Sequence, residues 1–415
     1  MRNVKRDLSL LFGMALILSA AAAPAVASQR SCEDLFRATH TMASAPSSLI
    51  RQYEASRSVS QKIRDNAPFY WAEVKAQEAS IFNGLPSELR AIVIVIGDLH
   101  SGNFSPVLVP GRGVRYTAYD IKDIGYGLGM MDINRLAMNT VEIARRGRPI
   151  SKLEERAMIQ RIIRAYRTGL LKNEYELTER FQDELPSEKK FNRKLAKKLE
   201  NKLADDGVLE VDGEAKLPLT VAARKLGVTL SELQGQLEAA LIANIGWGRL
   251  SDSIANIRDR GGSKESLRVL SLFEATDLKP VLKEFKELVP SAVSEYSAQP
   301  AREVLEVESS KYLDYDVGEL FPVVRIAGLK FVLRDKKLEP IVVPYKQKHE
   351  GDFERLMDLA VAHAQWAGTF HGRQLQAAGD RHVAYERAIG RSEATLIDRF
   401  MTFNAGHVRR LGGGQ

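Results

Sequence analysis

The chain has 415 residues, of which 44% are hydrophobic and 27% are charged, and its formal net charge is +7. This composition is typical of a folded globular protein, and neither low-complexity stretches nor internal repeats are evident. The length allows one large domain or two lobes around a sizeable core. Cys32 is the only cysteine, which excludes a disulfide within the chain.

The first residues have the pattern of a targeting segment. A basic start precedes an apolar run from Leu8 to Ala23, and Ala25-Val26-Ala27 then provides the small residues that a signal peptidase accepts. We therefore expect residues 1–27 to be a signal peptide and the mature protein to be periplasmic or secreted. An uncleaved anchor is the alternative, because the run approaches spanning length, whereas no later segment is long and apolar enough to span a bilayer.

A polar loop after a buried strand is the most informative motif. The β-branched run from Ala91 to Ile96 predicts the strand. Asp98 and Asn103 follow on one tight loop. Phosphotransferases need such a pair, a carboxylate that accepts a hydroxyl proton and an amide oxygen that helps to hold Mg²⁺.

A predicted hairpin brings a second carboxylate to this loop. Residues 104–109 and 114–119 alternate like strands, and the Pro/Gly cluster between them supplies the turn. Because paired strands lie about 5 Å apart, closing the hairpin places Asp120 beside Asn103. We expect Asp98, Asn103 and Asp120 to share one site.

The loop, the hairpin and the Asp/Gly run that begins at Asp120 resemble the catalytic core of aminoglycoside-phosphotransferase-like kinases. The run reads Asp120-Ile-Lys-Asp-Ile-Gly-Tyr-Gly127. The closer resemblance is to the bacterial family called domain of unknown function 2252, which is usually placed in the same kinase-like superfamily. A departure from the usual pattern is Ile96, which stands where a histidine normally precedes the base by two residues.

The resemblance implies roles for individual side chains. Asp98 would be the catalytic base, and Asn103 and Asp120 would be metal ligands. Asp132 would be a structural carboxylate at the start of a helix. His100 would shape the loop, although its place beside Asp98 also makes it a candidate catalytic residue.

A second motif downstream resembles the phosphate-binding half of a kinase site. A glycine-rich turn between strands offers N–H groups to phosphate oxygens, and a lysine on the next strand adds a positive charge. By the resemblance, Gly261 and Gly262 match the turn and Lys286 matches the lysine. The alternative is that residues 280–288 form an amphipathic helix with Lys286 on its wet face.

This motif follows the catalytic-loop motif, whereas the order is reversed in ordinary kinases. The resemblance therefore implies a circularly permuted arrangement, which the family of domain of unknown function 2252 shares. We expect an α+β, permuted protein-kinase-like fold with two lobes. Its parts would be a mostly helical lobe at 28–250, a smaller antiparallel sheet at 251–345, and C-terminal helices at 346–415 that pack on the large lobe.

Hydrophobic periodicity predicts the remaining elements. Expected strands include residues 329–334 and 340–345. The expected helices are residues 31–65, 132–147, 151–183, 187–204, 230–246, 351–378 and 381–410.

Three segments have a functional reading that we weigh against a structural one. The basic helix expected at 187–204 is typical of a solvated face, although binding of anionic lipid or polyphosphate stays open. Residues 220–233 look like a helix-turn-helix, but this pattern is generic, and no nucleic-acid partner is expected. His363 and His371 stand at helical spacing without a nearby acid, which favours packing over metal binding.

These observations predict an exported kinase-like protein that uses Mg²⁺ or Mn²⁺ with ATP on an unknown acceptor. ATP is scarce outside the cytoplasmic membrane, so the first alternative is a catalytically silent kinase-like protein that binds a ligand or an envelope partner. The second is a metal-dependent phosphoester hydrolase that uses Asp98, His100 and Asp120.

Overall fold

The computed structural model describes residues 58–172, 174–175, 179–201, 203, 208–209, 216–257, 266–275, 280–313, 315–335 and 350–411. All of them belong to one of the two units into which the chain divides. The expected signal peptide at 1–27, the turn at Gly261 and Gly262, and the expected strand at 340–345 lie outside these residues. Within them, no helix is long and apolar enough to cross a membrane.

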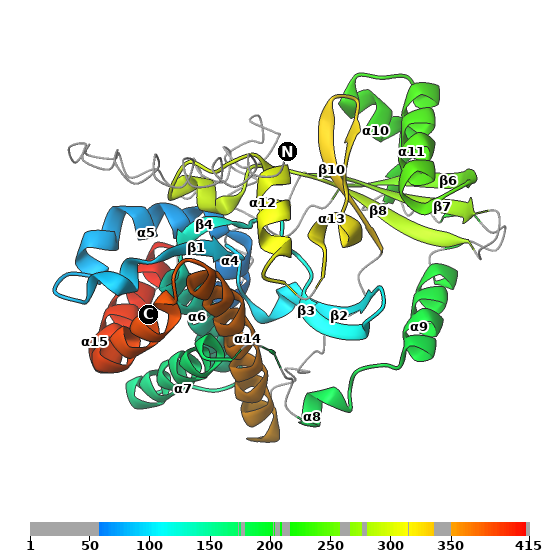
Figure 1. Ribbon diagram of the computed structural model, residues 1–415. Coiled ribbons are helices and arrows are strands. Elements are labelled where there is room, and N and C mark those ends of the chain that lie inside the picture. Colours follow the sequence, from blue (N-terminus) through cyan, green and yellow to red (C-terminus); the bar gives the residue numbers. More distant parts are fainter. Residues whose placement is uncertain are drawn as a thin grey trace, which may run out of the picture. The chain divides into compact units, whose positions relative to one another are not determined.

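Helices and antiparallel sheets both occur, as the α+β prediction requires (Figure 1). The helices are α4 (Val59–Asp65), α5 (Ala67–Ile81), α6 (Gly129–Gly147), α7 (Lys152–Leu170), α8 (Glu179–Gln182), α9 (Glu188–Glu200), α10 (Leu219–Leu226), α11 (Leu230–Ile245), α12 (Arg302–Ser310), α13 (Val317–Leu320), α14 (Glu350–Ala377) and α15 (Arg381–Arg410). The strands are β1 (Ile92–Val95), β2 (Phe104–Val109), β3 (Gly113–Ala118), β4 (Gly125–Leu128), β5 (Lys216–Pro218), β6 (Gly248–Ile257), β7 (Leu267–Ala275), β8 (Val281–Glu287), β9 (Val323–Ile326) and β10 (Leu329–Asp335).

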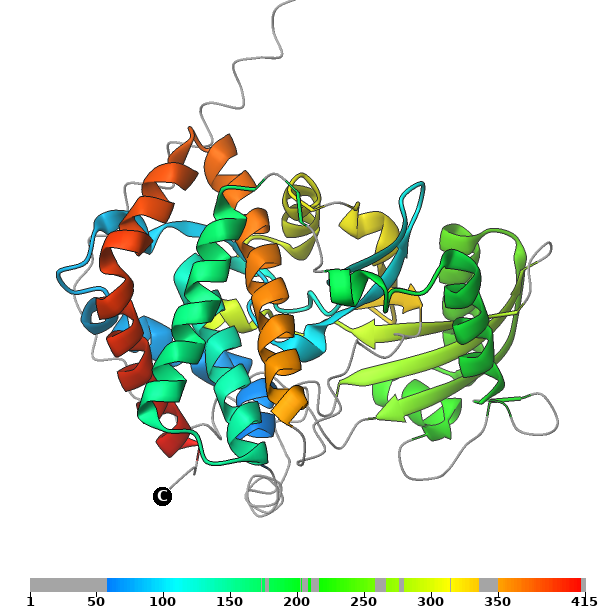
Figure 2. The same ribbon diagram turned by 90° about the horizontal axis from the view of Figure 1, so that it is seen from below.

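Helices α7 and α14 pack closely against each other, and Figure 2 shows them side by side. Three glycines make this approach possible. A Cβ atom on Gly169 would lie 2.2 Å from the carbonyl oxygen of Gln365, and one on Gly368 would lie 2.2 Å from that of Tyr166. Gly372 meets the carbonyl oxygen of Leu170 in the same way. Any side chain at these positions would push the two helices apart.

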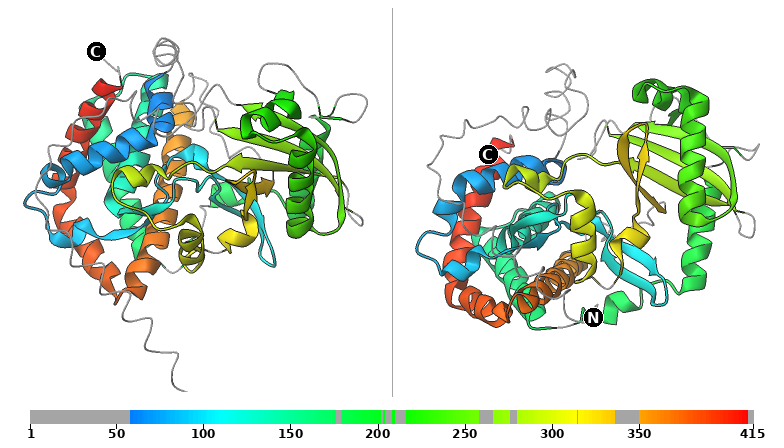
Figure 3. Two further views of the ribbon diagram at one scale, coloured as in Figure 1. Left: turned by 90° about the horizontal axis from the view of Figure 1, so that it is seen from above. Right: turned by 45° about the horizontal axis from the view of Figure 1, so that its top comes forward.

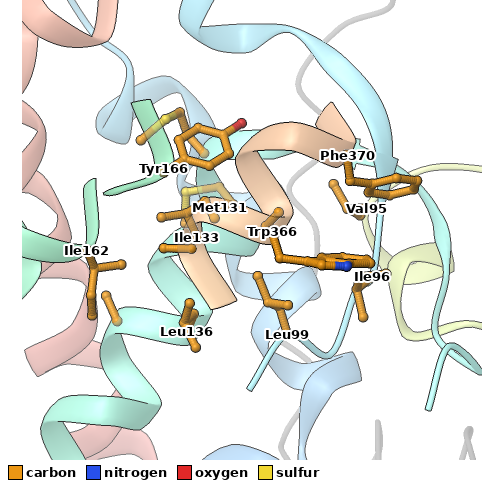
Figure 4. Close-up of a cluster of buried hydrophobic side chains, with 14 of the residues drawn as sticks. Val95, Ile96, Leu99, Met131, Ile133, Leu136, Ile162, Tyr166, Trp366 and Phe370 are labelled. Carbon is orange, nitrogen blue, oxygen red and sulfur yellow. The ribbon is translucent and has the colours of Figure 1, made fainter. Parts of the chain in front are cut away.

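The core under the polar loop is made by the end of β1 and by helices α6, α7 and α14 (Figure 4). Val95 and Ile96 lie beside Trp366 and Phe370 of α14, and all four are buried. Leu99, inside the loop, is completely buried. Burial of these side chains against the helices therefore holds the loop that carries the candidate site in position through the hydrophobic effect.

Two small sheets frame the loop. Strand β1 pairs antiparallel with β4, and β2 pairs antiparallel with β3 in the register from Phe104↔Ala118 to Val109↔Gly113. The predicted hairpin is confirmed. On the outer edge of β1, the side chain of Gln374 bonds to both backbone groups of Ile94, with Oε1 accepting from N–H at 2.6 Å and Nε2 donating to C=O at 3.0 Å.

A larger antiparallel sheet has the strand order β5-β6-β7-β8-β10-β9. Helices α10 and α11 cover one of its faces, as Figure 3 shows. Alternate residues of a strand face opposite sides of a sheet. The face toward α10 and α11 is therefore apolar, whereas the other face carries a small apolar cluster and buried charged residues; the charged residues are Arg268, Glu284, Lys286 and Arg334.

Several sequence predictions can be compared directly. The expected strand around Lys286 is confirmed and the helical alternative is wrong, because the segment is β8 in the middle of the sheet. The helices expected at 351–378 and 381–410 are confirmed as α14 and α15. The single helix expected at 151–183 is wrong beyond Leu170, where α7 ends.

Two further differences concern boundaries. The described end of the helix expected at 31–65 is α4, and a helix that was not expected, α5, follows after Asn66 with a proline in its first turn. The sheet also begins before residue 251, since its strands β5 and β6 start at Lys216 and Gly248. Helices α10 and α11, which cover the sheet, also start before this residue. Helices α10 and α11 form the predicted helix–turn–helix, with Gly227 at φ +70° and Thr229 capping α11.

Candidate functional site

The loop from β1 begins at Gly97, where only glycine fits. Its φ is +78°, and a Cβ atom would lie 2.1 Å from the carbonyl oxygen of Asp123. The carboxylate of Asp132, in the first turn of α6, accepts hydrogen bonds from the N–H groups of Ile96 at 2.9 Å and Gly97 at 3.1 Å. The structural role expected for Asp132 is thus visible. Burial raises its pKa to about 7, although these two hydrogen bonds oppose the shift.

Asp98 is only 5% exposed and is held by an arginine of α6. Arg135 donates to Asp98 Oδ1 from Nε at 3.0 Å and from Nη2 at 2.5 Å. Asp98 Oδ2 lies 3.5 Å from Nε2 of His100. Burial opposes the charge, but the attraction of Arg135 and Lys122 and a hydrogen bond from His100 outweigh it and hold the pKa of Asp98 well below its ordinary value.

His100 shapes the loop. Its Nδ1 accepts a hydrogen bond from the N–H of Gly102 at 3.0 Å, which caps the short 3₁₀ turn at Ser101–Asn103. Because Nδ1 is an acceptor, the ring is neutral and carries its proton on Nε2, toward Asp98. Burial lowers the pKa of His100, which agrees with the neutral form.

Asn103 connects the loop with the end of the hairpin. Its Nδ2 donates to the carbonyl oxygen of Asp98 at 2.6 Å, and its own carbonyl oxygen accepts from the N–H groups of Tyr119 at 2.7 Å and Asp120 at 3.3 Å. The structure therefore brings Asn103 and Asp120 together, as hairpin closure predicted. With Nδ2 committed to Asp98, Asn103 Oδ1 is left as the atom that could coordinate a metal.

Lys286 reaches this site from β8. Its Nζ donates to both carboxylate oxygens of Asp120, at 2.7 and 2.9 Å, and the Lys286 residue is only 2% exposed. Arg334, on the neighbouring strand β10, lies 4.0 Å from Asp120 Oδ1 and donates to Glu284 at 2.7 and 2.9 Å. Arg268 lies 3.4 Å from Glu284 on the other side.

The ionisable groups of this part of the site shift one another's pKa values. Burial opposes the charge on Asp120, but Lys286, Arg334 and Lys122 attract it and hold its pKa well below the ordinary value. Burial and the neighbouring arginines push the pKa of Lys286 down while Asp120 pushes it up. Since Nζ bonds both carboxylate oxygens, we take the pair as ionised. Among the described residues, the cations Lys286, Arg334 and Arg268 lie on this face beside the carboxylates of Asp120 and Glu284.

Lys122 links the two halves of the site. Burial lowers its pKa, but the attraction of Asp123, Asp120 and Asp98 raises it by more. Nζ of Lys122 lies 2.9 Å from Asp123 Oδ2. Asp123 in turn accepts a hydrogen bond from the N–H of Ala292 at 3.0 Å, so the segment that follows β8 is fastened to the segment that follows Asp120.

The donor atoms present suit Mg²⁺ or Mn²⁺ that arrives with phosphates. Within the described ranges, no group of three or more His, Cys, Asp or Glu side chains is placed to hold a metal ion. Magnesium, however, is commonly bound through one or two carboxylates together with substrate phosphates. An ionised Asp120 and the amide oxygen of Asn103 are donors of this kind.

Sequence reasoning missed four residues of the site, namely Arg135, Lys122, Arg334 and Glu284. An available signal was the charge pattern of two predicted strands, because a charged residue flanked by apolar ones in a central strand must find a partner.

Gly261 and Gly262 lie outside the described residues. His363 is completely buried and its ring stacks on Phe104 at 3.9 Å, with Nε2 3.2 Å from the Tyr116 hydroxyl.

Comparison with known proteins gives one family. Residues 66–216 match the model of a family described as "Uncharacterized protein conserved in bacteria (DUF2252)". No curated protein and no solved structure matches the chain. The matched segment includes Asp98, Asn103 and Asp120 and ends before Lys286. The comparison supports the resemblance to the family of domain of unknown function 2252 over the part of the chain that carries the polar loop and the hairpin.

Proposed function

We propose that this chain is an exported kinase-like protein that binds a nucleotide with Mg²⁺ or Mn²⁺ between Asp120 and Lys286 and transfers a phosphoryl group to an unknown acceptor. The observation that carries the proposal is the ion pair between these two residues, at 2.7 and 2.9 Å. It joins the end of the hairpin to the charged face of the large sheet. Export rests on the signal-peptide pattern of residues 1–27.

The ion pair supports this proposal because its two partners are of the kinds that bind phosphate and metal. Lys286 would exchange one carboxylate oxygen for a phosphate oxygen, which leaves Asp120 free to ligate the metal ion together with Asn103 Oδ1. The metal would neutralise charge on the phosphate oxygens. The cations Lys286, Arg334 and Arg268 support the same ligand, because lysine and arginine side chains bind phosphate oxygens through charge-assisted hydrogen bonds.

Asp98 would position the acceptor rather than remove its proton early. Arg135 occupies Oδ1, so Oδ2 is the oxygen that could accept a hydrogen bond from an acceptor hydroxyl. A carboxylate whose pKa is held this low is a weak base, and its contribution would be orientation of the hydroxyl.

The burial of Asp98 and its bond with Arg135 favour a second candidate, a catalytically silent kinase-like protein that binds a nucleotide or an envelope partner without transferring a group. An Asp98 that is 5% exposed and bonded by Arg135 could serve only to hold the loop. The hydrolase alternative would need His100 as a ligand or base, and its Nδ1 already accepts from Gly102.

The test is calorimetric titration of ATP with Mg²⁺ or Mn²⁺ into the purified mature protein and into Asp120→Asn. We expect metal-dependent binding that weakens at least about tenfold in the variant, because Asp120 would ligate the metal. Asp335→Asn is the matched control, since Asp335 is an exposed carboxylate paired with Lys283 of the same strand as Lys286. Equal affinity in all three proteins would remove Asp120 from a metal–nucleotide site.

If ATP binds, a scan for phosphoryl transfer separates the two candidates. Mature protein and Asp98→Asn are incubated with labelled ATP and an envelope extract. Label transfer that is lost in the variant supports the enzyme. Binding without transfer in either protein supports the silent candidate.

A further inference from the structure

A cavity lies beside β1 and is separate from the candidate site. Its volume is about 560 Å³, which is within the range of small-molecule sites. Its walls come from the turn before β1, from β1 and β4, from the end of α12 with Tyr312 after it, and from the junction of α14 and α15. None of Asp98, Asn103, Asp120 or Lys286 lines it.

One part of the cavity is apolar. Ile92 of β1 is 51% exposed although it belongs to a strand, and Leu375 of α14 lines the cavity near it. The rings of Tyr126 and Tyr312 line the cavity as well. An apolar or aromatic ligand body would cover the exposed surface of Ile92 and gain the corresponding hydrophobic stabilisation.

Another part of the cavity is lined by charged side chains. Arg90 and Arg381 both line it, and in the part of the chain that the structure describes neither guanidinium takes part in an ion pair. Two acids, Glu88 and Glu308, also line the cavity, but Glu308 is neutralised by Lys311 at 2.7 Å.

The N-terminus of α15 lies at this cavity as well. Arg381 is the first residue of this long helix, and the side chain of the residue before it, Asp380, makes no capping hydrogen bond. Helix N-termini present free N–H groups and the positive end of the helix dipole. Ala384, in the first turn, lines the cavity together with Arg381, so the free N–H groups are close to it.

From this cavity we infer a binding site for a small amphiphilic carboxylate. Arg90, Arg381 and the N-terminus of α15 hold the carboxylate, and the apolar body lies on Ile92 between the tyrosine rings. A carboxylate suits the two guanidinium groups because arginine binds its two oxygens with parallel hydrogen bonds. The inference does not depend on the proposed nucleotide site.

The experiment is calorimetric titration of octanoate, and separately of octanol, into the full-length mature protein and into Arg90→Gln/Arg381→Gln. Octanoate and octanol share the apolar chain and differ in the charged head. We expect one octanoate per chain, at least about tenfold weaker binding of octanol, and a similar loss for octanoate in the double variant. Arg387→Gln is the matched control, because Arg387 is an exposed arginine of α15 that does not line the cavity.

A second variant guards against a folding defect. Ile92→Glu places a negative charge on the exposed apolar wall and should abolish octanoate binding while leaving the melting temperature of the free protein nearly unchanged. Equal octanoate affinity in wild type and the double variant, octanol binding as tight as octanoate, or no heat with millimolar octanoate would each overturn the inference.

Discussion

Nζ of Lys286, on β8 in the large antiparallel sheet, donates to both carboxylate oxygens of Asp120, which follows the hairpin β2–β3 far earlier in the chain. The ion pair therefore joins the charged face of the sheet to the end of the hairpin, beside the hydrogen bond between Ala292 and Asp123. The first prediction concerns this pair.

Lys286→Met removes the charge and keeps a side chain of similar length. We expect the melting temperature to fall, with a cost of about 1–3 kcal/mol, because Asp120 loses a buried partner. If the proposed nucleotide site exists, ATP affinity falls at least tenfold as well. Lys283→Met, on the same strand, is the control and should change neither quantity by much, since Lys283 pairs with the exposed Asp335. An unchanged melting temperature in Lys286→Met would contradict the importance of the pair.

Arg135→Met tests the second ion pair. It leaves Asp98 buried and negatively charged without its partner, which costs about 3–5 kcal/mol when such a pair is broken. Urea denaturation measures the loss of unfolding free energy. The double variant Arg135→Met/Asp98→Asn should recover part of it, because the uncompensated charge is gone. Equal losses in the single and double variants would show that Arg135 contributes through packing or through its bond to the carbonyl oxygen of Ile63.

The buried carboxyl group of Asp132 predicts that the free energy of unfolding depends on pH. Burial raises its pKa in the folded state to about 7, above the unfolded value near 4, so the folded state binds this proton more tightly. That contribution to stability is fully present below about pH 4 and is lost as pH rises to about 7. Urea denaturation at a series of pH values should show the unfolding free energy of wild type falling relative to Asp132→Asn over this window. A constant difference would mean that Asp132 stays ionised.

Gly97→Ala tests the start of the loop. The substitution combines φ of +78° with a Cβ atom 2.1 Å from the carbonyl oxygen of Asp123, so the backbone must move, and we expect a loss above about 3 kcal/mol. Gly111→Ala separates the two causes. Gly111 has φ +69° but nothing within 4 Å of an added Cβ, so only the backbone strain of about 1 kcal/mol remains. Similar losses at both positions would contradict the steric explanation.

Much of the fold follows from local patterns. The hairpin from β2 to β3 was predictable because alternation and a Pro/Gly turn lie within a few residues, and the proximity of Asn103 and Asp120 follows from its closure. Helices α14 and α15 were predictable because their periodicity extends over many turns.

The partners of the site could not be predicted, since they come from distant segments. Arg135 stands in a helix where arginine usually faces solvent, and only the packing of α6 under the loop turns it toward Asp98. The segment of β8 was ambiguous because Leu282, Phe285 and Leu288 fit a helical period, while alternation places Lys286 on the charged face of a strand. Sheet pairing with β7 and β10 decides between the two.

The side chain of Gln374 has one more consequence. A free strand edge offers N–H and C=O groups with which another chain can pair and aggregate. On β1 the amide of Gln374 occupies both groups of Ile94, and just after the strand Asp132 occupies the N–H groups of Ile96 and Gly97. Gln374 of α14 thus blocks this edge of β1 against pairing with another strand, and Gln374→Leu would leave the N–H and C=O groups of Ile94 unpaired near the loop of Asp98.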